Sequence, residues 1–108
     1  MLIKYGVDIN NLDIVSNIER ITNLIFKLLP TREEGNDWKT PLANLIVEVS
    51  GMSNLIEDHS DLFSLLCKME GLLTLTKEDD FPLFRKNIFE CLMLCNNLKK
   101  VIEDEWIR

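Results

Sequence analysis

The stretch FRKNIFECLMLCNNLKKVI, residues 84–102, decides the fold, because its apolar side chains recur at the spacing of a helix. Successive members of one apolar seam are three or four residues apart. That seam consists of Phe84, Ile88, Cys91, Cys95, Leu98 and Ile102. We therefore predict a long amphipathic helix over about residues 81–105, with Asp79 or Asp80 as its cap.

Within this helix, residues 88–95 are apolar in nearly every direction, and Glu90 interrupts them. A surface helix of a small bundle normally keeps a polar face toward water. One explanation is a central helix wrapped by the rest of the chain. The other is that Phe89, Leu92 and Met93, which lie off the seam, form a protein-binding patch.

Two amphipathic segments come before residue 57. The first is predicted over about 11–29, ended by Pro30. The second begins with Thr40 as its N-cap and Pro41 in its first helical position. Their seams are expected to be Ile14, Ile18, Ile21, Ile25 and Leu28 in the first, and Leu42, Leu45, Val49, Met52 and Ile56 in the second.

A third segment follows the polar stretch 57–61, with Ser60 or Asp61 as its cap and a seam of Leu62, Leu66, Met69 and Leu73. Four amphipathic helices with short links predict an all-α fold, an antiparallel four-helix bundle. We expect a single domain over 1–108, with the bundle over 11–108 and a short extended arm over 1–10.

The arm is predicted from an apolar side chain at every second position, which is typical of a half-buried strand. Ile3, Tyr5 and Val7 share one side of it. An extended segment has unpaired backbone groups, so it needs a partner. We expect these three residues to contribute to partner binding.

Composition excludes several classes of function. The chain has 18 Asp and Glu against 12 Lys and Arg, a net charge of −6. This is the wrong sign for direct binding of nucleic acid or of an anionic membrane by charge. No apolar run approaches the about 20 residues needed to cross a bilayer, and no signal peptide is evident. Three cysteines in helical segments predict free, buried thiols and a cytoplasmic location.

Few residues suggest chemistry. Glu48 falls near the apolar seam, where it is expected at the edge of a tight helix crossing made by Ser50 and Gly51, paired with an Arg or Lys. His59 lies among acids in a polar loop, which is more typical of helix capping than of a metal site. No phosphate loop, catalytic triad or pair of metal-binding carboxylates is found. We expect no enzyme activity, no cofactor and no metal.

The sequence therefore predicts a non-catalytic protein–protein interaction protein, either a homo-oligomer or a small accessory subunit of a larger complex. The last helix and the arm would dock on protein. The alternative is an acidic inhibitor, or decoy, that blocks a nucleic-acid-binding complex by charge.

Overall fold

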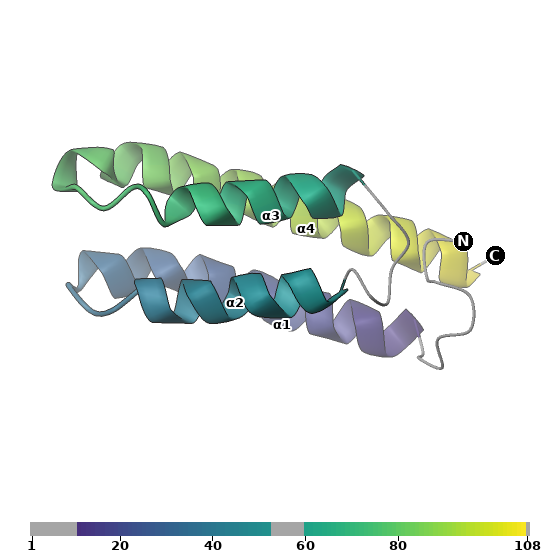
Figure 1. The fold of residues 1–108 in the computed structure, drawn as a ribbon. Coiled ribbons are helices and arrows are strands. Elements are labelled where there is room, and N and C mark those ends of the chain that lie inside the picture. The colour runs from purple at the N-terminus through teal and green to yellow at the C-terminus, as the bar shows by residue number, and fades with distance from the viewer. Residues whose placement is uncertain (1–10, 53–59, 108) are drawn as a thin grey trace.

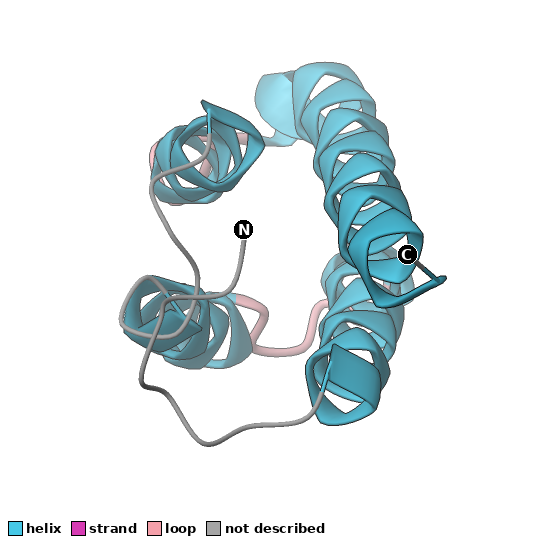
Figure 2. Ribbon diagram, turned by 90° about the vertical axis from the view of Figure 1, so that its right-hand side faces the viewer, coloured by secondary structure: helices cyan, strands magenta, loops and turns pink. Residues whose placement is uncertain are grey.

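The computed structural model describes residues 11–52 and 60–107 of the chain. The described elements are α1 (Asn11–Glu33), α2 (Lys39–Met52), α3 (Ser60–Leu72), the 3₁₀ helix η1 (Glu78–Asp80) and α4 (Phe81–Ile107). The four α-helices pack together as an all-α bundle, with α1 beside α2 and α3 beside α4 (Figure 1). Seen along the bundle, α1 also lies next to α4, and α2 next to α3 (Figure 2).

The core is built from the seams that helical spacing predicted. All six seam residues of α4 are buried, as are those of α1 and the described seam residues of α2. Ile56, at the end of the expected α2 seam, lies outside the described residues.

In α3 the prediction is correct for Leu62 and Met69 and wrong for the other two seam residues. Leu65 and Leu72 are buried, whereas Leu66 and Leu73 are partly buried against the core. The sequence has two adjacent leucines at both places, so periodicity alone does not choose between them. Packing in the bundle makes the choice, and α3 is also joined to α4 by the ion pair of Lys68 with Glu90.

Pro30 was predicted to end α1, and this prediction is wrong: Pro30 lies inside the helix. The proline ring is on the exposed side of the helix, and the helix continues to Glu33. Gly35 follows the end of the helix, and its φ of 77° is a conformation that favours glycine. The amide of Gly35 donates to the Arg32 carbonyl at 3.0 Å and that of Asn36 to the Thr31 carbonyl at 3.0 Å, the pattern of a Schellman cap.

The start of α2 also differs from the prediction. Asp37, rather than Thr40, is the cap, because its Oδ1 accepts from the amides of Lys39 at 3.0 Å and Thr40 at 3.2 Å. The hydrogen bonds with Thr40 lower the pKa of the Asp37 carboxyl. Capping three residues early turns Trp38 inward, where it is 9% exposed and joins the core.

Arg32 connects several elements at the end of the bundle where α1 ends and α2 and α4 begin. Its guanidinium donates to the carbonyl oxygens of Leu75 at 2.6 Å and Lys77 at 2.8 Å, in the segment that joins α3 to η1. It also lies 4.9 Å from the ring centroid of Trp38 and 4.5 Å from that of Phe84, which themselves meet edge to face. One side chain thus joins α1, the residue just before α2, the start of α4 and the α3–η1 connection.

Contacts between α1 and α4 have the order expected of antiparallel neighbours. Arg32, near the end of α1, lies by Phe84, near the start of α4. Earlier in α1, Glu19 pairs with Lys99, which is later in α4, at 3.0 Å. These two contacts set which side chains line the surface between the two helices.

Candidate interaction surface on α1 and α4

The three residues of α4 that were predicted to bind a partner differ in how exposed they are. Phe89 is 45% exposed and Met93 is 58% exposed. Leu92 is partly buried and packs against the core, so it supports the helix and offers little surface for a partner. The difference follows from helix geometry, because Leu92 is rotated toward α1 whereas Phe89 and Met93 point farther outward.

An aromatic residue of α1, absent from the prediction, completes this surface. Phe26 is 50% exposed, and with Phe89 it lines a groove between α1 and α4. The groove has a volume of about 380 Å³. Its lining residues are Phe26, Leu29, Pro30, Glu33, Phe81, Arg85 and Phe89. We call Phe26, Phe89 and Met93 the apolar patch.

The sequence contained a signal for Phe26. It follows Ile25 directly and therefore lies off the seam of α1, just as Phe89 lies off the seam of α4. A large aromatic side chain in that position is either exposed or covered by a neighbouring helix. The antiparallel-type contacts of α1 and α4 place the two phenylalanines on the same groove.

The other large exposed apolar side chains are spread over the bundle. Val47 is on α2, Phe63 on α3 and Leu83 near the start of α4. Isolated apolar residues of this kind are ordinary on protein surfaces.

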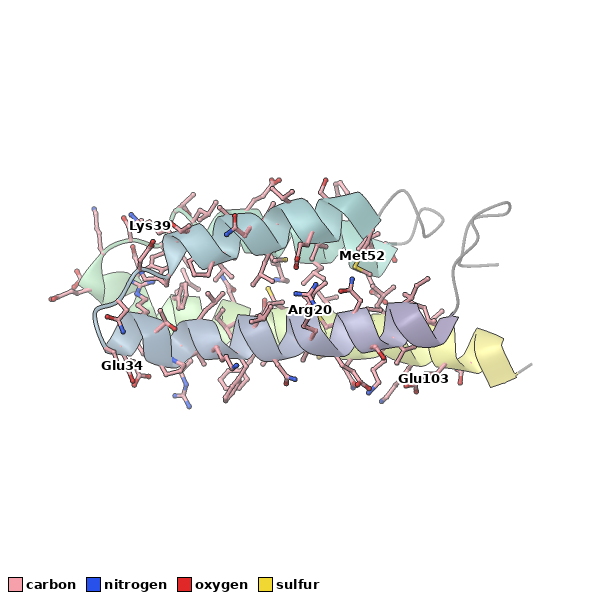
Figure 3. All side chains as sticks on the ribbon, turned by 90° about the horizontal axis from the view of Figure 1, so that it is seen from below. Arg20, Glu34, Lys39, Met52 and Glu103 are labelled. Carbon is pink, nitrogen blue, oxygen red and sulfur yellow. The ribbon has the colours of Figure 1, made fainter. Side chains whose placement is uncertain are left out.

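A second groove, of about 370 Å³, lies between α1 and α2. Arg20 projects between these helices (Figure 3) and donates to Glu48 Oε2 at 3.1 Å and to Asn17 Oδ1 at 2.7 Å. The expectation that Glu48 meets an Arg or Lys is confirmed. The cation and the carboxylate neutralise each other, and Lys27 is the other charged residue among those that line this groove.

The described helices do not form the tight crossing expected at Ser50 and Gly51. Both residues are exposed, and no described heavy atom lies within 4 Å of a Cβ built at Gly51. The buried side of α2 is set by Leu45, Val49 and Met52. Gly51 falls outside that face, and its small size serves no close approach by a described residue.

Three ion pairs join the described helices. Glu19 pairs with Lys99, Glu48 with Arg20, and Glu90 with Lys68. The bond from Lys68 lowers the pKa of the Glu90 carboxyl. A nucleic-acid decoy needs a continuous stripe of carboxylates, and these pairs interrupt the acids on the described helices.

Two of the three thiols, Cys91 and Cys95, are buried in the core. Burial raises the pKa of Cys91 to about 12 and that of Cys95 to about 11, so both stay protonated near neutral pH. Cys67 is exposed and, like the other two, carries no disulfide. Over the described residues, no cluster of three or more His, Cys, Asp or Glu side chains is placed to hold a metal ion.

Several predicted residues lie outside the described part of the chain. These are His59 and the arm residues Ile3, Tyr5 and Val7. Within the part that is described, no helix is both long enough and apolar enough to cross a membrane. Comparison with known proteins adds no assignment, since no family model, curated protein or solved structure matches this chain.

Proposed function

We propose that this protein is a non-catalytic interaction protein that docks on another protein chain through the apolar patch, with the N-terminal arm contributing to the contact. The observation that carries this proposal is that Phe26 and Phe89, each about half exposed, line one groove, with the exposed Met93 one helical turn beyond Phe89 on α4. Apolar clusters of this kind mark interaction sites more often than isolated exposed residues do.

The size of the apolar patch limits the binding free energy that it can contribute. Half-exposed side chains of this size leave roughly 100 Å² each available, or about 300 Å² together. At about 25 cal/mol per Å², covering them gives about 7 kcal/mol. Association itself costs about 4–15 kcal/mol, so the patch supplies anchors and the groove and its polar rim must supply the rest of the interface.

Substitution of the anchors tests the proposal. Phe89→Glu and Met93→Glu place a charge in the middle of the patch but leave the buried seam intact. Phe63→Glu is the matched control, because Phe63 is an exposed phenylalanine at 70% on α3, away from the groove. Circular dichroism would show whether each variant keeps its helices.

Native mass, measured by light scattering over a range of concentration and salt, gives the first result. An oligomer that is lost in Phe89→Glu and Met93→Glu but kept in Phe63→Glu supports self-association through the patch. A monomer whose binding of a hydrophobic dye falls in the same two variants supports a different partner chain. Equal behaviour of all three folded variants contradicts the proposal.

A further inference from the structure

We propose that the outer surface of the α1–α4 pair binds a second copy of this chain across a two-fold axis, with α1 of each copy lying against α4 of the other. This inference rests on the proposed docking function and adds the identity of the partner. Two neighbouring grooves between the helices define the surface, which we name the α1–α4 face.

Both grooves lie on the same side of the two helices. The first is the groove that contains Phe26 and Phe89. The second has a volume of about 280 Å³. Its lining residues are Glu19, Thr22, Asn23, Asn96 and Lys99. On each helix the residues of the second groove continue the helical spacing of the first, so both sets share one side of that helix.

Charge on the α1–α4 face is divided between the two helices. Among the residues that line the two grooves, the acids Glu19 and Glu33 come from α1, and the cations Arg85 and Lys99 come from α4. Glu33 and Arg85 share the first groove, whereas Glu19 and Lys99 share the second and pair at 3.0 Å. A partner must therefore offer cations opposite α1 and acids opposite α4.

A two-fold axis through the first groove supplies this arrangement. Because α1 and α4 have the order of antiparallel neighbours, half a turn about an axis perpendicular to both lays α1 of the second copy along α4 of the first. The acidic helix of one copy then meets the basic helix of the other, and symmetry forms each contact twice.

The aromatic residues set the register of the two copies. With Phe89 of one copy opposite Phe26 of the other, the four rings form one cluster at the axis. Met93, four residues after Phe89, then faces Pro30, four residues after Phe26. The side chains of the apolar patch, each about half exposed in the single chain, are thereby covered.

This register brings Arg85 to an acid. Arg85 lies four residues before Phe89. Glu19 lies seven residues before Phe26, so across the interface the two charges are three residues, or about 4.5 Å, apart along the helix axes. The long guanidinium side chain can span that offset. Its position 5.6 Å from the centroid of its own Phe89 ring keeps it beside the aromatic cluster.

The same register gives Glu33 two polar partners. Glu33 lies seven residues after Phe26, and Asn96 lies seven residues after Phe89, so these two face each other. Lys99 follows Asn96 by three residues, about 4.5 Å farther along α4. The amide of Asn96 and the ammonium of Lys99 can both donate to the Glu33 carboxylate of the second copy.

Other charges lie outside the overlap. Glu33 is the last residue of α1, so no α1 residue of the second copy faces the charges that come later on α4. These are Lys100, Glu103 and Asp104. Lys27 and Lys86 line neither groove of the face. The net charge of −6 on each copy opposes approach, but salt screens it beyond about 8 Å under physiological conditions.

The size of the face predicts a dimer of moderate affinity. From Glu19 to Glu33, α1 is about 21 Å long, and two helices side by side are about 20 Å wide. The projected area is therefore about 400 Å² per copy, below the roughly 800 Å² of a standard interface. We expect a dissociation constant of about 1–100 µM.

Partners of other chemistry match the face less well. Nucleic acid and anionic lipid carry charge of one sign, so they would meet the acids Glu19 and Glu33 as well as the cations. A different protein would need acids and cations in two parallel rows at this spacing. A second copy provides both rows by symmetry.

Sedimentation equilibrium of the full chain tests the inference. Over about 5–500 µM protein in about 0.15 M salt, the mass should rise from that of the monomer toward that of the dimer. Phe89→Glu should abolish this rise. Phe63→Glu and Lys39→Glu, which change exposed residues of α3 and α2, should leave it unchanged.

A charge exchange between two copies identifies the contact. Arg85→Glu and Glu19→Arg each place like charges opposite one another, so each should weaken its homodimer at least about tenfold. In an equimolar mixture the two substituted positions face each other, and the native Arg85 and Glu19 face each other at the second contact. The mixture should therefore recover a dimer about as tight as the wild type.

The failures of the inference and of the docking function are distinguishable. A chain that stays monomeric, but binds a hydrophobic dye that Phe89→Glu releases, keeps the docking function and overturns the second copy as its partner. A dimer that survives both Phe89→Glu and Arg85→Glu, or a mixture that recovers no dimer although each folded variant has lost it, overturns the proposed pairing. A monomer whose dye binding is unaffected by Phe89→Glu contradicts both proposals. Circular dichroism would establish that each variant is folded.

Discussion

Replacing Arg32 with alanine tests how the bundle is closed at the end where α1 meets α2 and α4. The side chain makes two hydrogen bonds to backbone carbonyls, those of Leu75 at 2.6 Å and Lys77 at 2.8 Å. It also contacts the rings of Trp38 and Phe84. Alanine removes all of these contacts at once and leaves two carbonyls of the α3–η1 connection without their donor.

The expected loss follows from these contacts. A partly buried hydrogen bond from a charged donor contributes about 1.5 kcal/mol, and the more exposed bond to Lys77 about 0.5 kcal/mol. Contacts with the aromatic rings add about 0.5–1 kcal/mol. We therefore expect Arg32→Ala to lower the free energy of unfolding by about 2.5–3 kcal/mol, equivalent to about 10–20 °C in Tm.

Chemical denaturation followed by far-UV circular dichroism measures the loss. The chain has two tryptophans, so fluorescence in a Trp106→Phe background would report on Trp38 at the closed end. Arg32→Lys keeps the charge but lacks the planar fork with its several donors, and should lose about half as much.

Arg85→Ala is the control, because Arg85 stacks on one ring, that of Phe89, and is exposed. It should cost at most about 0.5 kcal/mol. If Arg32→Ala costs less than about 1 kcal/mol, or no more than Arg85→Ala, the side chain does not hold this end together and the reasoning is refuted.

Three further predictions concern other parts of the bundle. Gly51→Ala should stabilise the protein by about 0.5–1 kcal/mol in urea denaturation, because alanine favours the helix and a Cβ at this position meets no described atom within 4 Å. A loss of stability would instead indicate a close contact at Gly51. Of the three thiols, Cys67 should react quickly with a disulfide reagent, whereas Cys91 and Cys95 should react at the rate of unfolding; rapid labelling of all three would contradict their burial. The folded state lowers the pKa of Asp37, so the ionised cap stabilises the fold above the ordinary carboxyl pKa of 3.8, and this contribution is lost as the pH falls. The difference in unfolding free energy between the wild type and Asp37→Ala should therefore shrink in acid. A difference that does not depend on pH would refute the capping role.

The exposed apolar patch was partly predictable. Off-seam Phe89 and Met93 stand out in the sequence because a helix in a small bundle seldom has apolar residues all round. Phe26 was not identified, and Leu92 was placed on the surface although it packs against the core. Both errors arise because residues on the flank of a helix are covered or exposed according to the neighbouring helix, which the sequence of one segment does not specify.

At the helix boundaries, too, the sequence offers local signals and the tertiary structure decides between them. Pro30 is a strong stop signal, but its ring lies on the exposed side of α1, and the Schellman cap at Gly35 stops the helix instead. Asp37 lies three residues before the cap that was expected, and its position brings Trp38 into the core. Local signals were present at each place, and tertiary packing selected among them.

The sequence by itself determined that this chain forms four amphipathic helices and which stripe of α4 is buried, because the spacing of apolar residues fixes one face of each helix independently of its neighbours. Tertiary structure decided three other features: the choice of Leu65 over Leu66, the enclosure of Arg32 by aromatic rings, and the meeting of Phe26 with Phe89 across a groove. Each of these depends on the rotation and pairing of two helices. A rotation of one residue, about 100°, leaves the apolar spacing intact but changes which flanking side chains meet a partner.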